Sequence, residues 1–113
     1  MAHVEHRARI EAERIAAAAR LAQLEQQLVD LRALRRGEQD DDEHDPDGVP
    51  LSEEWSRLEG LRAQAVRTLA ELEAAAEAAA RGETPTCTRC GAPIPPGRLE
   101  ARPQARTCVD CAA

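Results

Sequence analysis

The chain has 113 residues, of which 42% are hydrophobic and 32% are charged, and Trp55 is its only aromatic side chain. Alanine supplies 23 of the hydrophobic residues. Because alanine buries little apolar area, a thick multilayer core cannot offset the entropy of ordering such a chain. Charged residues mixed with Ala, Leu and Gln are typical of long helices and coiled coils. We therefore expect a small, mainly α-helical protein and not a conventional globular enzyme.

The net charge of −6 is distributed unevenly along the chain. Residues 37–54 carry nine acids and no base, whereas residues 1–36 have a net charge of +2 and residues 83–113 a net charge of +1. A net-acidic chain is a poor general binder of the phosphate backbone of nucleic acids. We therefore expect the acidic segment to face a basic surface or a cation.

The sequence gives no indication of export or membrane insertion. Its first residues lack the apolar core of a signal peptide. No run approaches the roughly 18 apolar residues that a membrane span needs. We therefore expect a cytoplasmic protein with no membrane association, in a compartment where structural disulfides are rare.

A first helix is predicted over about residues 4–36. Its leucines alternate three and four positions apart, which is the spacing of a coiled-coil seam, and the same seam continues earlier through Ala17 and Ile10. We expect Gly37 to cap the end of this helix, because glycine readily adopts a left-handed conformation. The seam leucines are Leu21, Leu24, Leu28 and Leu31.

A second helix is predicted over about residues 53–81, with Ser52 as its N-cap and Gly82 as its C-terminal cap. A stripe with strict four–three spacing runs along it, and Arg62 is the one charged residue in that stripe. The stripe consists of Trp55, Leu58, Arg62, Ala65, Leu69, Leu72, Ala76 and Ala79.

Two amphipathic helices joined by about 15 residues indicate an antiparallel coiled-coil hairpin over residues 1–82, with an acidic tip at about 38–50. A straight coiled coil between chains is the alternative. Glycine and proline in the join favour the hairpin, and we expect a monomer. An antiparallel return places early helix 2 beside late helix 1, so Trp55 should be partly buried among its neighbours. The expected neighbours are Leu28, Leu31 and Leu34.

Four cysteines define a small module over residues 83–113. They form two C-x2-C pairs separated by 17 residues, at Cys87, Cys90, Cys108 and Cys111. Two such loops complete a tetrahedral site, and Zn²⁺ is the metal that best suits four thiolates. One structural Zn²⁺ is therefore predicted, because four protein ligands leave no open position for a substrate. Two disulfides, four free thiols, a redox pair or an iron site are the alternatives.

The acidic join contains the run from Asp40 to Asp47. Charge runs are commonly solvated loops, and that is one interpretation of this segment. Its position at the tip of a rigid hairpin favours another, in which its carboxylates are delivered into a basic or metal-containing site of a partner.

These parts together resemble the DksA/TraR family of bacterial RNA polymerase-binding transcription factors. The resemblance lies in the patterns C-x2-C-G-x2-I from Cys87, R-L-x-A-x-P from Arg98 and C-x2-C-A from Cys108. It implies a coiled coil that enters the secondary channel of RNA polymerase, an acidic tip near the active centre and a zinc finger at the base of the hairpin. The family tip often has the pattern D-x-x-D-x-A. Here Asp42 and Asp45 match it, but Asp47 stands where alanine is expected.

The resemblance implies a non-enzymatic regulator of transcription that binds RNA polymerase and recognises no DNA sequence. Asp42 and Asp45, with Asp47 as a weaker third, are the candidate tip residues. One alternative is a polymerase accessory factor whose tip carboxylates hold a catalytic Mg²⁺ and promote transcript cleavage. Another is a coiled-coil scaffold whose zinc end binds a different protein. A third is a nucleic-acid module, which lacks aromatics for stacking and would use Arg89, Arg98, Arg102 and Arg106.

Overall fold

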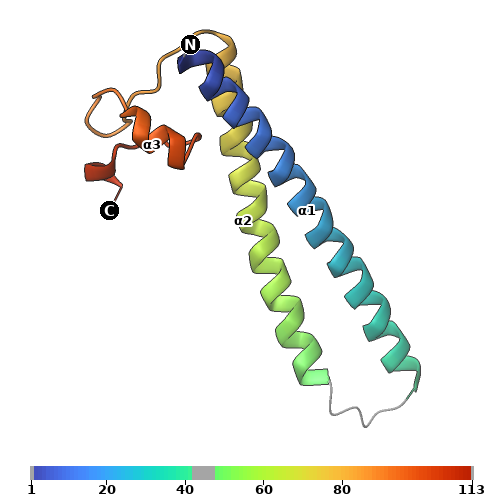
Figure 1. Cartoon of the computed structure of the whole chain (residues 1–113). Helices are drawn as coiled ribbons and strands as arrows, with labels where there is room; N and C mark the ends of the chain where they lie inside the picture. Colours follow the sequence, from blue (N-terminus) through green and yellow to red (C-terminus); the bar gives the residue numbers. More distant parts are fainter. Residues whose placement is uncertain (1, 42–47, 113) are drawn as a thin grey trace. The chain divides into compact units, whose positions relative to one another are not determined.

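The computed structural model describes residues 2–41 and 48–112. These residues form two long helices, one short helix and one 3-10 turn (Figure 1). In the described part of the chain there is no strand beyond an isolated antiparallel bridge between Thr86 and Pro93. None of the described helices is long and apolar enough to cross a membrane. The prediction of a mainly α-helical chain with two long helices is confirmed. The elements are α1 (Ala2–Asp41), α2 (Gly48–Ala80), α3 (Pro96–Ala101) and η1 (Val109–Cys111).

The chain divides into two compact units. One unit is Ala17–Arg67, and the other combines Met1–Ala16 with Thr68–Ala113. Each unit contains a stretch of α1 and a stretch of α2, and the second unit also contains α3, η1 and all four cysteines. The units are described separately below.

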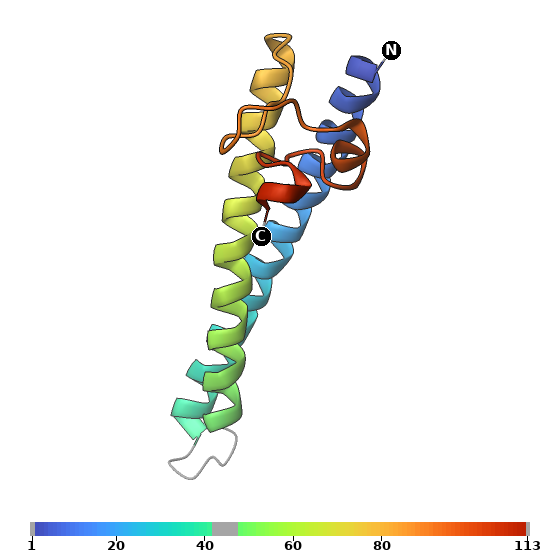
Figure 2. The same cartoon turned by 90° about the vertical axis from the view of Figure 1, so that its left-hand side faces the viewer.

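In the unit Ala17–Arg67, α1 and α2 lie side by side (Figures 1 and 2). The predicted seam forms its core, in which Leu24 is only 1% exposed. The leucines of α1 pack on α2 because their three–four spacing keeps them on one face of a helix with 3.6 residues per turn. The buried cluster consists of Leu24, Leu28, Leu31 and Leu58, with Leu51, Trp55, Leu61 and Ala65 packed against it.

Trp55 is half-buried against this cluster, as its seam position predicts. The guanidinium of Arg32 on α1 lies 5.4 Å from the centre of its ring. That distance is within the range of a cation–π interaction, which also links the two helices. Leu34 was expected to be a neighbour of Trp55, but it is 59% exposed and lies outside the cluster. The expectation was wrong because Leu34 lies three residues beyond Leu31, whereas the alternating spacing requires four.

Replacing Trp55 by alanine is expected to lower the free energy of unfolding by about 3 kcal/mol at most, since the ring is only half-buried. Urea unfolding followed by circular dichroism measures this cost. The matched control is Val29→Ala, because Val29 is 54% exposed on α1 and its truncation should change stability by less than about 0.5 kcal/mol. Because Trp55 is the only aromatic residue, its emission reports this packing directly. An emission maximum that is the same in the folded and unfolded protein would contradict the arrangement.

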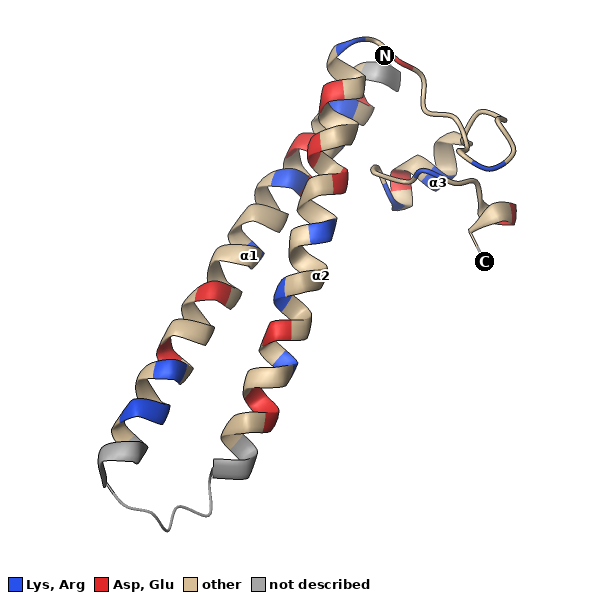
Figure 3. Ribbon diagram, turned by 180° about the vertical axis from the view of Figure 1, so that it is seen from behind, with Lys and Arg blue, Asp and Glu red and all other residues tan. Residues whose placement is uncertain are grey.

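Arg62 interrupts the apolar stripe of α2, and the structure gives it a partner. Its guanidinium lies 3.1 Å from a carboxylate oxygen of Glu25 on α1. Both side chains are partly exposed, so the pair contributes little stability by itself. The pair does neutralise the charge of Arg62 at its seam position, and it thereby favours the observed register between α1 and α2. Acidic and basic residues are interspersed along the described parts of both long helices (Figure 3).

The second unit has a core of its own at the ends of the long helices. Ile10 on α1 and Leu72 on α2 are each 1% exposed, and His6 is buried as well. A separate small cluster in the C-terminal segment contains Ile94, Leu99 and Ala105. The cysteine-rich segment therefore buries very few apolar side chains of its own.

Two predicted helix ends were wrong. α1 does not stop at Gly37 but continues to Asp41, and Gly37 has no positive φ. A glycine inside a helix costs about 1 kcal/mol, which is too little to end a helix whose next residues can continue it. α2 begins at Gly48, so Ser52 lies inside the helix and is not its N-cap. Pro50 did not prevent the earlier start, because proline in a first turn loses no intrahelical hydrogen bond.

The predicted end at Gly82 is confirmed. α2 ends at Ala80, and Gly82 adopts φ +77°. The N–H of Gly82 donates to the Ala79 carbonyl at 3.0 Å, and the N–H of Glu83 donates to the Ala78 carbonyl at 3.1 Å. These two hydrogen bonds form a Schellman motif, in which a left-handed glycine satisfies the last carbonyls of a helix. The chain thus leaves the helix at a defined angle just before the cysteine-rich segment.

Candidate metal centre

The first cysteine pair lies on a tight turn held by backbone hydrogen bonds. The N–H of Cys87 donates to the Ala92 carbonyl at 2.7 Å, and the N–H of Gly91 donates to the Cys87 carbonyl at 2.9 Å. Gly91 has φ +77°, a conformation that a residue with a Cβ rarely adopts. Glycine at this position therefore allows the chain to turn between the two cysteines and the segment that follows them. The turn presents the sulfurs of Cys87 and Cys90 to the same side.

The second pair spans η1. Cys108 precedes η1 and Cys111 is its last residue, and the N–H of Cys111 donates to the Cys108 carbonyl at 3.1 Å. This turn gives the two cysteines the same close spacing as the first pair. The first turn is joined to the segment before the second by a hydrogen bond from the N–H of Thr88 to the Arg106 carbonyl at 2.8 Å.

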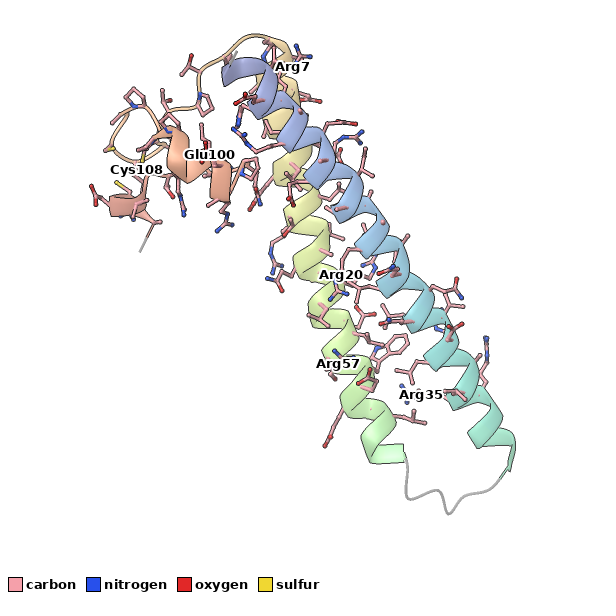
Figure 4. The ribbon with its side chains drawn as sticks, viewed as in Figure 1. Arg7, Arg20, Arg35, Arg57, Glu100 and Cys108 are labelled. Atoms are coloured by element: carbon pink, nitrogen blue, oxygen red, sulfur yellow. The ribbon has the colours of Figure 1, made fainter. Side chains whose placement is uncertain are left out.

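The four sulfur atoms converge on one point. All lie within 4.8 Å of one another, and those of Cys90 and Cys108 are 3.9 Å apart. Figure 4 shows the sulfur-bearing side chains gathered beside the labelled Cys108. Four sulfurs around Zn²⁺ at about 2.3 Å would be about 3.8 Å from one another, so the spacing fits such an ion. None of the four cysteines forms a disulfide in this structure. The cysteines are therefore positioned to bind one metal ion.

The surroundings of the sulfurs favour thiolate at one position. Backbone N–H groups, first that of Cys108 and then that of Cys90, lower the pKa of the Cys87 thiol to about 6. The pKa of Cys111 is raised to about 12, mainly because its thiol donates hydrogen bonds to the sulfurs of Cys108 and Cys87. Backbone N–H groups thus stabilise a thiolate at Cys87, whereas the neighbouring sulfurs favour the protonated form of Cys111. Since a metal ion would have to displace the remaining thiol protons, metal binding should strengthen as the pH rises.

Two arginines of this segment bind backbone carbonyls. Arg89 donates from Nη1 to the carbonyl of Cys111 at 3.1 Å, and Arg98 donates from Nε to the carbonyl of Thr107 at 3.4 Å. A third, Arg102, lies 4.0 Å from a carboxylate oxygen of Glu71. The sequence suggested these arginines only as candidate phosphate contacts. Their carbonyl partners could not be identified from sequence, because they depend on how the two turns are placed together.

The predicted tip residues Asp42, Asp45 and Asp47 lie outside the described residues, so their role stays a prediction. The described structure ends α1 at Asp41 and begins α2 at Gly48.

The comparisons agree with the resemblance found in the sequence. Residues 82–113 match the family model described as the prokaryotic dksA/traR C4-type zinc finger. Among solved structures, transcription factor DksA2 from Pseudomonas aeruginosa matches with a TM-score of 0.77 at 24% identity. That match covers 96% of this chain and 78% of DksA2. The search of curated proteins found no significant match.

The match to DksA2 extends over both long helices and the cysteine-rich segment, whereas the family model is confined to the latter. The predicted fold, a two-helix hairpin followed by a C4 zinc finger, is therefore confirmed. Residues 82–113 thus match the prokaryotic DksA/TraR C4-type zinc finger, and the chain has the fold seen in DksA2.

Proposed function

We propose that the protein is a non-enzymatic regulator of transcription that binds RNA polymerase. The observation that carries the proposal is the combination of a DksA/TraR-type finger at residues 82–113 with a likeness to a solved transcription factor that covers 96% of the chain. The finger makes the likeness to that factor specific, because two-helix hairpins by themselves occur with many functions. The protein would act in the cytoplasm as a monomer.

The finger holds one structural Zn²⁺ through Cys87, Cys90, Cys108 and Cys111. Convergence of four free sulfurs supports this ligand set. An ion with four protein ligands has no open position, so its contribution is to fix the fold of the segment and not to activate water or substrate. A purely structural zinc ion is consistent with the proposed non-enzymatic role.

The hairpin inserts into the secondary channel of the polymerase and brings its acidic tip near the active centre. Its geometry supports this arrangement, because a helix of 33 residues such as α2 is about 50 Å long. Acidic and basic residues are interspersed along both long helices, so charged side chains are available to contact the walls of such a channel (Figure 3). Asp42 and Asp45, with Asp47 as a weaker third, are the residues proposed to modulate the polymerase.

The arginines of the finger favour a protein partner over nucleic acid. Arg89 and Arg98 are engaged with backbone carbonyls, and Arg102 lies close to Glu71. These contacts leave fewer guanidinium groups free to bind phosphates. The finger also has no aromatic side chain on which a base could stack. Recognition of a DNA sequence is not part of the proposed function.

The direct test is binding to purified core RNA polymerase, measured by competition with a labelled copy of the protein. We expect saturable binding by the zinc-loaded chain. A protein that does not bind core polymerase, but captures another partner through its zinc end, would overturn the proposal in favour of the scaffold alternative.

A second measurement separates the regulator from a transcript-cleavage factor. Stalled elongation complexes carrying end-labelled RNA are incubated with saturating protein and Mg²⁺. The proposal expects no shortening of the RNA above the rate of polymerase alone. Cleavage that depends on Asp42 and Asp45 would instead show that the tip carboxylates hold a catalytic metal ion.

A further inference from the structure

Arg89 contacts both halves of the metal centre. Its backbone N–H donates to the sulfur of Cys87 at 3.4 Å, in the first turn. Its guanidinium donates to the carbonyl of Cys111 at 3.1 Å, in the second turn and 22 residues further along the chain. One residue therefore connects the first and the last of the four cysteines. This double contact joins the two turns independently of any metal ion.

Cys111 is the cysteine for which such a contact has the largest consequence. It ends η1, which has only three residues and a single turn of local hydrogen bonds. Upstream contacts hold the chain at Arg106 and Thr107, before Cys108. The bond from Arg89 holds the other end of the turn, after the last cysteine. Holding the carbonyl in place restrains the backbone of Cys111 and thereby limits the positions that its side chain can reach.

We propose that Arg89 is a positioning residue of the metal centre, which holds Cys111 in place for coordination and thereby slows release of the ion. The inference rests on the proposed zinc site but assigns a role that the C-x2-C spacing does not include. Neighbouring groups that orient metal ligands commonly change metal affinity by about 10- to 100-fold when they are removed. Because the Arg89 side chain is exposed, its effect lies at the lower end of that range.

The charge of Arg89 acts in the same direction as its hydrogen bond. Four thiolates around a divalent ion have a net negative charge, and a guanidinium bound to the backbone of one ligand stabilises that charge. Lysine at this position would keep the positive charge but not the planar set of donors. Comparing R89A with R89K therefore separates the hydrogen bond to the carbonyl from the charge.

The test measures zinc release from the full-length protein into an excess of a chromogenic chelator. R89A should release zinc about tenfold faster than the wild type, with R89K between the two. The matched control is R106A, which removes the same side chain from an exposed position in the same segment and keeps the backbone carbonyl that binds Thr88. R106A should release zinc at nearly the wild-type rate.

A second readout separates positioning from general weakening of the finger. Each protein is alkylated under limiting reagent, and the modified cysteines are identified by mass spectrometry of peptides. In R89A and R89K we expect Cys111 to react first, ahead of Cys87, Cys90 and Cys108. Equal reaction of all four cysteines, or zinc release from R89A at the wild-type rate, would overturn the inference. A wild-type protein that contains no zinc would instead refute the proposed zinc site itself.

Discussion

Changing Asp42 and Asp45 together to asparagine is expected to abolish the effect of the protein on transcription initiation while polymerase affinity stays within a modest factor of the wild-type value. Asparagine removes the two charges and keeps nearly the same shape. The fold should not change, because an exposed acidic loop contributes little stability and the substitution relieves repulsion among its carboxylates. The variant should bind RNA polymerase but fail to modulate it. The hairpin sides and the finger supply the contact area for binding, whereas the tip acts on the charged active centre.

The measurement is paired. Affinity for core polymerase is measured by competition, and the output or open-complex lifetime of a sensitive promoter is measured in a purified system. The matched control is Glu53→Gln with Glu59→Gln, which also removes two negative charges from exposed positions but does so on α2. This control should regulate as the wild type does. A tip variant that regulates normally would leave the acidic run as a solvated loop and remove the proposed mechanism.

The buried seam could be predicted because it depends on spacing alone. Leu24, Leu28 and Leu31 lie on one face of any regular helix, so their burial requires only that a second helix pack there. The helix ends depend on small energy differences and were harder to predict. Gly37 offered a plausible stop, but its cost inside a helix is only about 1 kcal/mol. Gly82 is also a glycine, but it adopts a left-handed φ just after the end of α2, and Pro85 soon after it disfavours continuation of the helix.

In the metal centre, too, local features could be predicted from the sequence, whereas contacts between distant residues could not. Four cysteines in two C-x2-C pairs specify a local geometry, and the structure brings their sulfurs together as predicted. The contacts of Arg89 and Arg98 connect positions that the sequence separates by 22 and 9 residues. These contacts depend on how one turn is placed against the other, and the spacing of residues in the sequence does not determine that placement. The cation–π pair of Arg32 with Trp55 escaped prediction for the same reason, because it depends on the register between α1 and α2.

Replacing Cys90 by serine is expected to abolish zinc binding and to unfold residues 84–113 while most of the helix in α1 and α2 remains. Serine has nearly the same shape, but its hydroxyl is a poor ligand for Zn²⁺. The small cluster of Ile94, Leu99 and Ala105 buries too little area to hold the segment folded by itself. A structural zinc ion contributes on the order of 10 kcal/mol, so its loss outweighs what those residues supply.

Cys90 is the most suitable cysteine for this test because its side chain is exposed. Cys87, by contrast, is only 2% exposed and also packs in the interior. A change at Cys90 thus removes a ligand with little loss of packing. Zinc content is measured by elemental analysis, helix content by circular dichroism, and order in the finger by limited proteolysis. The control is Thr88→Ala, an exposed change in the same turn that leaves all four sulfurs and the backbone hydrogen bond to Arg106 in place.

If Cys90→Ser keeps one zinc per chain and a protected finger, then four-cysteine coordination is wrong. If it instead loses the helical signal together with zinc, the hairpin requires the finger for its own stability.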